Sequence, residues 1–301
     1  MALSFRKQPR ENYLANNPIV FELLAEDSTE LINYNLQLDE TDIYSGMVYP
    51  FGKGTDFYAR IEVSDILKSK INPYETEKSD DVLKSVSGSY QTLHITFYQE
   101  STTLNATARI YRGGISKKML RQLNENNTDI FSDRLLNRGK PFLLTSRTAS
   151  GNIMMKRSEL APVYFIASGG NYKIAADNGY ELTAPNLTAG NVYAFDLSHE
   201  KFDGASFLQF FIDNNPVCSI TVLEPAAVPF RFLLSFLNSF EVYEKIEITG
   251  KAFFEPEPEE TEGYSVYDDR IDDYVEMRDR INFRETVNAE TGYKTLEEFL
   301  F

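Results

Sequence analysis

The stretch INYNLQL at residues 32–38 alternates apolar and polar side chains, and the same period of two recurs at residues 57–63 and 93–97. Successive side chains of a β-strand point to opposite faces of a sheet, so this alternation places one face of each strand on a core. Turns that contain Gly or Pro separate the runs. Similar strand-sized runs follow in the second half of the chain, at residues 192–197 and 217–223. The pattern is typical of antiparallel sandwiches.

Length and composition agree with this interpretation. A chain of 301 residues is long enough for two domains that each bury a core without disulfides or metals. The 22 Phe and 18 Tyr favour strands, because flat side chains pack well on a half-buried pleated surface. We therefore expect a mostly β fold. It has two consecutive antiparallel β-sandwich domains of the jelly-roll or Ig-like kind, one short helix between them and an extended acidic C-terminal segment.

Local signals set the expected boundaries. Ser116 precedes apolar residues at helical spacing, which predicts a helix with a Ser N-cap. A polar stretch at residues 72–89 predicts a long surface loop or an edge insertion. The expected units are an extended arm at residues 1–17, a first sandwich at 18–150 with a helical insert near 116–124, a second sandwich at 151–254, and an acidic linker and docking tail at 255–301.

The negative charge of the chain is concentrated at its end. Of the net charge of −15, residues 255–301 carry −10, from 15 Asp and Glu against 5 Lys and Arg. Such a surface repels phosphate backbones, so we expect no nucleic-acid partner. Acidic residues spaced by Pro at 255–263 predict a linker. Apolar residues at uneven spacing of three to four then predict a marginal amphipathic helix or an extended strap, and residues 295–298 match a helix capping box.

Targeting and redox signals are sparse. No run approaches the roughly 20 apolar residues that a membrane-spanning helix needs, so we expect no membrane insertion. The first thirty residues have no sustained apolar stretch, which predicts that they contain no secretory signal peptide. The single cysteine, Cys218, lies in an apolar run and is expected to be a small buried hydrophobe, with no disulfide framework.

Residues suited to catalysis are few. Only His94 and His199 are available for general acid–base work, and they fall in different predicted domains. Neither lies near a nucleophile motif, and three Cys and His residues cannot supply four zinc ligands. We therefore expect no catalytic, metal or cofactor-binding residues and no enzyme. A glycoside hydrolase remains a minor alternative, and it would require two carboxylates facing each other across a cleft at roughly 5–10 Å.

The two ends of the chain have opposite charge, because basic residues lie in the arm and acidic residues with interspersed aromatics lie in the tail. Ends of opposite charge can lie on neighbouring subunits, and Tyr gives contact area at low entropic cost. The alternative is that both ends are simply disordered. The candidate partner-docking residues are Arg6, Lys7, Arg10, Tyr264, Tyr267, Ile271, Tyr274, Tyr293, Leu296 and Phe299.

Three stretches resemble a known group of proteins. They are MALSFRKQPR at residues 1–10 with NNPIVF at 16–21, RFLLSFLN at 231–238 and TGYKTLEE at 291–298. In that order they resemble virion or tail-associated structural proteins of tailed phages and prophages of Bacteroidetes. This chain carries Phe236 where those proteins usually have Trp, and they continue past the third stretch into another β domain. The resemblance implies strings of β-sandwich domains without catalytic residues.

The expected function is therefore a non-enzymatic structural component of a phage or prophage particle that acts through protein–protein assembly. Its expected partners are other particle proteins, with copies of itself and a glycan left open. Its expected location is the virion, which is assembled in the host cytoplasm. The alternative is a carbohydrate- or protein-binding β-sandwich module with a stacking platform of Tyr and Phe.

Overall fold

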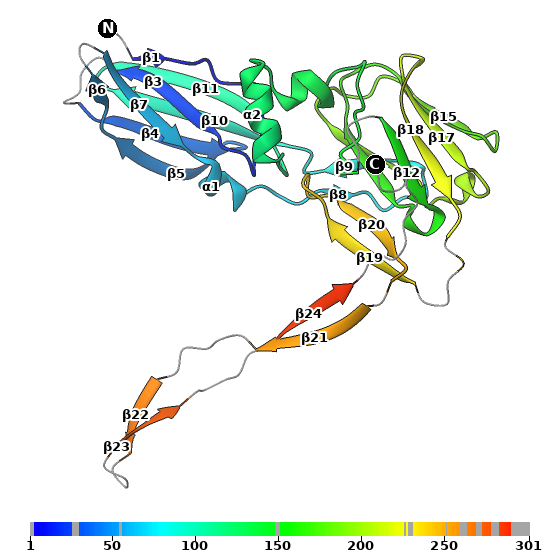
Figure 1. Ribbon diagram of the computed structural model, residues 1–301. Helices are drawn as coiled ribbons and strands as arrows, with labels where there is room; N and C mark the ends of the chain where they lie inside the picture. Colours follow the sequence, from blue (N-terminus) through cyan, green and yellow to red (C-terminus); the bar gives the residue numbers. More distant parts are fainter. Residues whose placement is uncertain are drawn as a thin grey trace.

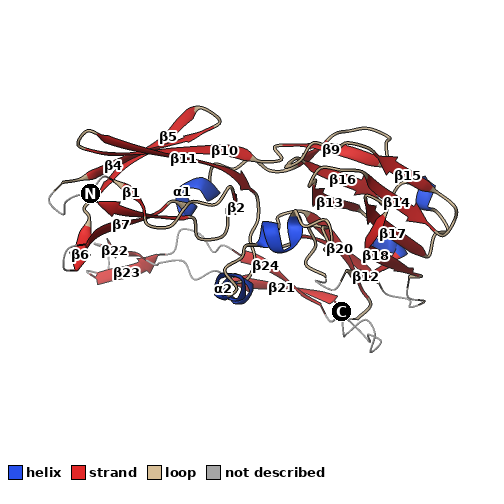
Figure 2. Cartoon of the chain, turned by 90° about the horizontal axis from the view of Figure 1, so that it is seen from above, coloured by secondary structure: helices blue, strands red, loops and turns tan. Residues whose placement is uncertain are grey.

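The computed structural model describes residues 3–25, 30–53, 56–147, 151–225, 227, 231–250, 252–258, 264–268, 273–277 and 283–289. Strands dominate these ranges, and most of them form two β-sandwiches that lie side by side (Figures 1 and 2). The expected mostly β fold with two sandwiches is confirmed. The strand pairings are antiparallel with two parallel exceptions, β2–β11 and β12–β18.

The first sandwich packs a four-stranded sheet on a five-stranded one. The first sheet, in spatial order, contains β1 (Ser4–Phe5), β3 (Val20–Ala25), β7 (Asp56–Glu62) and β6 (Phe51–Lys53). The second contains β2 (Asn12–Leu14), β11 (Thr102–Tyr111), β10 (Gln91–Gln99), β4 (Ile32–Leu38) and β5 (Thr41–Val48). The core lies between them around Phe21, Leu36 and Phe97, which alternate with more exposed neighbours as the sequence pattern predicts.

The expected N-terminal arm instead forms part of this first sandwich. β1 pairs with β3, and β2 pairs in parallel with β11. Leu3 and Leu14 are buried, and Phe5 packs edge-to-face against Phe97 with 6.0 Å between ring centroids. Polar and charged residues outnumber apolar ones in this segment, yet its described apolar residues, Leu3, Phe5, Tyr13, Leu14 and Ala15, all lie in a core or pack against one.

The second sandwich has the same two-layer design. One sheet contains β12 (Asn152–Lys156), β18 (Asn215–Leu223), β17 (Phe207–Ile212), β14 (Tyr172–Ala176) and β15 (Glu181–Ala184). The other contains β13 (Pro162–Ile166), β16 (Val192–Asp196), β9 (Leu83–Ser87) and β8 (Glu75–Thr76). Its core is aromatic, with the Phe165 ring stacked between Tyr172 at 4.8 Å and Phe195 at 5.1 Å.

The polar stretch at 72–89 crosses from the first sandwich to the second. Its strands β8 and β9 extend the β13–β16 sheet, and the chain then returns to the first sandwich at β10. A boundary near residue 150 therefore does not separate the strands of the two sandwiches. Pairing between residues 83–85 and 193–195 spans more than a hundred positions, and no local signal in the sequence encodes it.

A third core joins the two sandwiches. Helix α1 (Ser64–Lys68) follows β7, whereas α2 (Lys117–Glu125) lies between the sandwiches (Figure 1). The Ser116 hydroxyl accepts a hydrogen bond from the Met119 amide at 3.2 Å and so caps α2. After α2, a π-helical turn at Phe131–Leu135 packs Phe131 on Tyr111 with 5.1 Å between ring centroids. Val192, Ala194, Phe240 and Val242 of the second half complete this core.

Three more pairs of strands follow the sandwiches. Strands β19 (Phe232–Leu237) and β20 (Tyr243–Ile248) form a separate two-stranded sheet. Beyond it, β21 (Ala252–Pro258) pairs with β24 (Phe283–Ala289), and β22 (Tyr264–Asp268) pairs with β23 (Asp273–Met277). These last pairs extend away from the two sandwiches (Figure 1). Two single-turn 3-10 helices, Arg157–Glu159 and Glu200–Phe202, lie in loops of the second sandwich.

The segment predicted to be an acidic linker therefore contains a strand. Pro256 and Pro258 lie within β21, opposite Glu285 and Phe283 of β24. Proline is tolerated in a two-stranded ladder where its missing N–H faces the free edge. Successive residues of a strand direct their backbone N atoms to opposite edges, so two prolines separated by one residue direct theirs to the same edge.

Candidate interaction surface

Two of the three basic docking candidates near the N-terminus contact the first sandwich or the helical segment beside it. The Arg6 guanidinium lies 3.9 Å from the Glu22 carboxylate and 5.2 Å from the centroid of the Tyr58 ring. Arg10 donates a hydrogen bond to the Asn124 side chain at 3.0 Å, beside the end of α2. Lys7 is exposed and makes no ion pair with any described residue. The docking role of these residues stays a prediction.

The docking candidates in the tail fall partly inside the described residues. Tyr264 and Tyr267 lie on β22 and Tyr274 lies on β23, with Tyr267 directly opposite Tyr274. The predicted amphipathic helix or extended strap is therefore a β-hairpin at these positions. Tyr and Val favour strands, and this preference outweighs the uneven helical spacing. Ile271, Tyr293, Leu296 and Phe299 lie outside the described residues, as does the predicted capping box.

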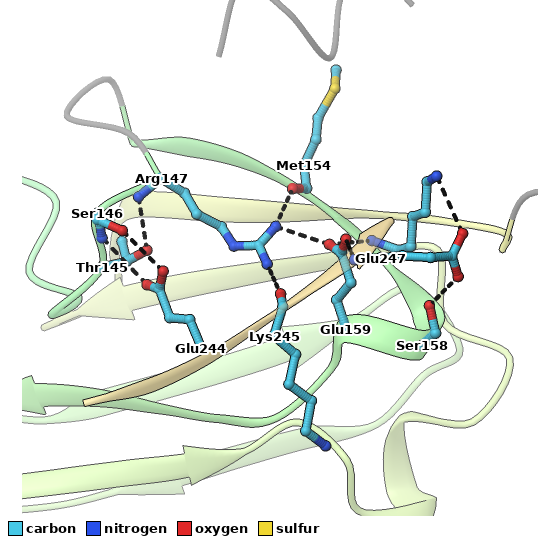
Figure 3. Close-up of polar contacts among 10 residues, drawn as sticks. Thr145, Ser146, Arg147, Met154, Ser158, Glu159, Glu244, Lys245 and Glu247 are labelled. Atoms are coloured by element: carbon cyan, nitrogen blue, oxygen red, sulfur yellow. Dashed lines mark hydrogen bonds and ion pairs between the residues drawn. The ribbon is translucent and has the colours of Figure 1, made fainter. Parts of the chain in front are cut away.

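A network of buried charges holds β20 against the second sandwich (Figure 3). Glu159, 3% exposed, accepts hydrogen bonds from the Arg147 guanidinium at 2.8 Å and from the backbone amide of Glu247 at 2.7 Å. Arg147 also donates to the carbonyl oxygen of Lys245. The side chains of residues 147 and 159 thus form hydrogen bonds with backbone groups along one edge of β20. In a wider sheet, a neighbouring strand would bind these groups.

The other acids of the network, Glu247 and Glu244, also have charged or polar partners. The Glu247 carboxylate, 1% exposed, lies 3.2 Å from the Lys156 ammonium and accepts a hydrogen bond from the Ser158 hydroxyl at 2.6 Å. Glu244 accepts from the Ser146 hydroxyl at 3.0 Å and from the Asn238 side chain at 3.0 Å. Breaking one member of such a buried pair costs about 3–5 kcal/mol, because the other charge is left uncompensated. The network therefore fixes the position of the β19–β20 hairpin.

The space beside this network is small. A cavity of about 20 Å³ lies between β20 and strands β12 and β13, and its lining includes Arg147, Tyr243 and Glu244. That volume suits about one water molecule. The buried acids are engaged by cations, backbone amides and polar side chains. Their role is therefore to hold β20 in place.

Strand β19, by contrast, is exposed on both faces. Phe232, Leu233, Leu234 and Leu237 are each between 46% and 52% exposed, and Tyr243 at the start of β20 is 62% exposed. The strand reads FLLSFL and carries no charge. Soluble proteins usually protect such an edge with charged side chains, Pro or a bulge. A contiguous apolar surface of this kind marks an interaction site.

The backbone of β19 also has a free edge. Because the Glu247 amide and the Lys245 carbonyl point toward residues 159 and 147, they point away from β19. Leu233 lies opposite Glu247 and Ser235 lies opposite Lys245, so both are non-hydrogen-bonded pairs of the antiparallel ladder. In such a pair the amide and carbonyl groups of both residues point away from the partner strand, so those of Leu233 and Ser235 point away from β20. No described residue forms a backbone hydrogen bond with these outward groups. The edge can therefore accept another strand.

Sequence reasoning identifies residues 231–238 through the resemblance but does not select them as a docking surface. A strand that is apolar on both faces is most simply a fully buried strand. Only the structure, in which β20 is held against the second sandwich and β19 is not, shows that this strand is exposed. The absence of charge does not distinguish this strand either, because the largely buried strands β17 and β18 also carry no charge.

Both histidines serve local structure. The His199 ring accepts a hydrogen bond from the Lys201 amide at 3.1 Å and contacts the Asp80 carbonyl at 2.8 Å, whereas His94 bonds Thr107 at 3.1 Å. Within the described ranges no group of three or more His, Cys, Asp or Glu residues is placed to hold a metal ion. Within the same ranges no helix has the length and apolar character needed to span a bilayer.

Comparison with known proteins finds likenesses to solved structures, all at low sequence identity. No family model matches the chain, and no curated protein matches its sequence. Among solved structures, the periplasmic chaperone SfaE is similar over 74% of this chain and 100% of its own, at 7% identity and a TM-score of 0.22. A titin fragment gives the same coverages at 11% identity and a TM-score of 0.25. The structure of Dpr2 Ig1–Ig2 in complex with DIP-Theta is similar over 87% of this chain and 86% of its own, at 8% identity and a TM-score of 0.23. The assignment of this chain to the β-sandwich class rests on its own sheets.

Proposed function

We propose that this chain is a non-enzymatic structural component of a phage or prophage particle and that it acts through protein–protein assembly. The observation that carries the proposal is strand β19, an uncharged apolar strand with a free backbone edge. The β-sandwich fold is compatible with an interaction module. The particle setting rests on the resemblance of residues 231–238, which coincide with this strand, to virion and tail-associated proteins.

The anchoring of the hairpin supports the same proposal. An interface strand has to be held in a fixed position before its partner arrives, since ordering it on binding would reduce affinity. The buried network of Arg147, Glu159, Lys156 and Glu247 provides that rigidity for β20, and β20 holds β19 through a six-residue ladder. The strand pairs β21–β24 and β22–β23, which extend away from the sandwiches, are a second element that a neighbour could contact.

The test is a quantitative protein inventory of purified particles from the host that carries the gene. The proposal expects this chain to co-purify with the particles at a fixed ratio to the other particle proteins and to resist washing. A particle preparation that lacks the chain would contradict the particle role.

A second candidate function, glycan binding, is favoured by one observation. The first sandwich exposes Tyr44, Met47, Tyr49 and Phe51 along β5 and the start of β6, with exposed fractions of 43% to 67%. Exposed aromatic rings can stack on sugars. The candidate predicts signals on a glycan array that a Tyr49→Ala, Phe51→Ala double variant loses; an array without signals for the folded protein would remove it.

A further inference from the structure

The free edge of β19 is self-complementary. Because Leu233, Ser235 and Leu237 direct their amide and carbonyl groups outward, an incoming antiparallel strand must bond to those residues. A second copy of β19 meets this requirement when a two-fold axis passes through Ser235. Leu233 of each copy then lies opposite Leu237 of the other, and Leu234 lies opposite Phe236. Between Leu233 and Leu237, every opposed pair in this register is apolar or, at Ser235, a pair of hydroxyls; Phe232 lies opposite Asn238, beyond the end of β19.

We propose that this chain forms a two-fold dimer in which β19 of one copy pairs antiparallel with β19 of a second copy about Ser235. The proposal deepens the assembly function proposed above and rests on it. A C2 interface is isologous, so one patch has to complement itself. A strand without charge can pair with its own copy without placing like charges opposite each other. In a chain of net charge −15, this distinguishes β19 from most of the surface.

The choice of a second copy over another protein follows from charge. The chain as a whole has a net charge of −15, so two copies repel each other over most of their surface, whereas residues 232–237 add no charge to that repulsion. The β19 edge is a place where backbones can approach within a hydrogen bond without that repulsion. A single strand pair of five residues is a small interface, below about 1,200 Å², so the dimer should be of the weak class and depend on concentration.

The first experiment uses two matched charge variants of the full chain. In the proposed register residue 233 faces residue 237 of the other copy. A Leu233→Lys, Leu237→Glu double variant therefore places opposite charges together twice, whereas a Leu233→Lys, Leu237→Lys double variant places like charges together twice. Both variants put two charges at half-exposed positions of the same strand, so they perturb the folded monomer to a similar degree.

Sedimentation velocity over a concentration series into the high micromolar range reads out the result. The proposal expects the unmodified chain to approach twice its mass of 34.4 kDa, the Lys/Glu variant to retain the dimer at low salt, and the Lys/Lys variant to remain a monomer. Added salt should weaken the Lys/Glu dimer. Equal behaviour of the two variants, or an unmodified chain that stays monomeric throughout, would overturn the pairing.

A second experiment tests the register. Antiparallel partners that exchange backbone hydrogen bonds lie about 5.5 Å apart at Cα, within the roughly 4.4–6.8 Å that a disulfide bridges. Ser235→Cys should therefore cross-link into dimers under mild oxidation. Leu237→Cys should not, because its two copies lie four residues apart along the strands, more than about 13 Å. The native Cys218 is buried and gives no competing reaction. Cross-linking at 237 but not at 235 would overturn the register.

Failure of this inference and failure of the proposed function are distinguishable. If the chain is monomeric in solution and the Lys/Lys variant is nevertheless lost from particles, another protein occupies the β19 edge. In that case the assembly function stands and the pairing of two copies is wrong. If the particle inventory lacks the chain while the dimer forms as predicted, the pairing stands and the particle role is wrong.

Discussion

At the scale of single residues, the structure predicts the reactivity of the Cys218 thiol. Burial raises the pKa of its thiol to about 12, and the side chain is 3% exposed in the second core. The thiolate is the reactive form, so this cysteine should be inert near neutral pH. We expect no reaction with a thiol-specific chromogenic reagent in the native state and one equivalent after unfolding in urea. Rapid labelling of the native protein would show that this core opens.

Glu159 should be the most sensitive acid in the network that holds β20. Its replacement by Ala leaves the Arg147 guanidinium and the Glu247 amide without their partner. We expect the free energy of unfolding to fall by about 3 kcal/mol or more. The matched control is Glu181→Ala. Glu181 pairs with Lys173 at 2.8 Å but is 58% exposed, so its loss should cost less than about 1 kcal/mol. Urea denaturation of both variants checks the difference, and equal losses would contradict the structural role of the network.

At the scale of elements, the pairing of β9 with β16 should depend on pH. Burial alone would raise the pKa of Asp196, but hydrogen bonds from Lys84 and Ser198 outweigh it and hold that pKa below its usual value. The Lys84 ammonium lies 2.7 Å from the carboxylate and joins the two strands. The resulting stability is present above the unfolded pKa of about 3.9 and is lost as pH falls through the lower folded value.

Asp196→Asn provides the corresponding measurement. Its unfolding free energy should lie about 1–2 kcal/mol below that of the unmodified chain at pH 6. The gap should narrow as pH falls below about 4, because the carboxyl is protonated first in the unfolded chain and, at lower pH, in the folded chain as well. Urea titrations at pH 6 and pH 3 give the two gaps. A gap that is unchanged at pH 3 would show that the ionised carboxylate is not what joins β9 to β16.

The elements also show how far the sequence predicts this fold. Alternation at residues 32–38 and 93–97 predicts β4 and β10, and Ser116 marks the start of α2, because these signals are local. The transfer of β8 and β9 to the second sandwich has no local signal, since it depends on pairing with distant residues. The exposed β19 surface is not predictable either, because a buried apolar strand and an exposed apolar strand have the same sequence pattern.

At the scale of the whole molecule, the third core should make the two sandwiches unfold together. Phe131 lies at its centre and packs on Tyr111, whose hydroxyl donates to the Gly190 carbonyl across the two sandwiches at 3.0 Å. The chain has no Trp, so Tyr98→Trp and Phe207→Trp at exposed positions can report on one sandwich each. Their urea transitions should coincide. Adding Phe131→Ala should separate them, because it opens a cavity at the junction. Separate transitions without that substitution would contradict a shared core.

The central claim is that this chain assembles through β19, and the most direct test is incorporation of the two charge variants into particles. Particles are purified from cells in which each variant replaces the unmodified chain, and quantitative mass spectrometry gives its ratio to the other particle proteins. The account predicts near-normal incorporation of the Leu233→Lys, Leu237→Glu variant and loss of the Leu233→Lys, Leu237→Lys variant. Normal incorporation of both would contradict it.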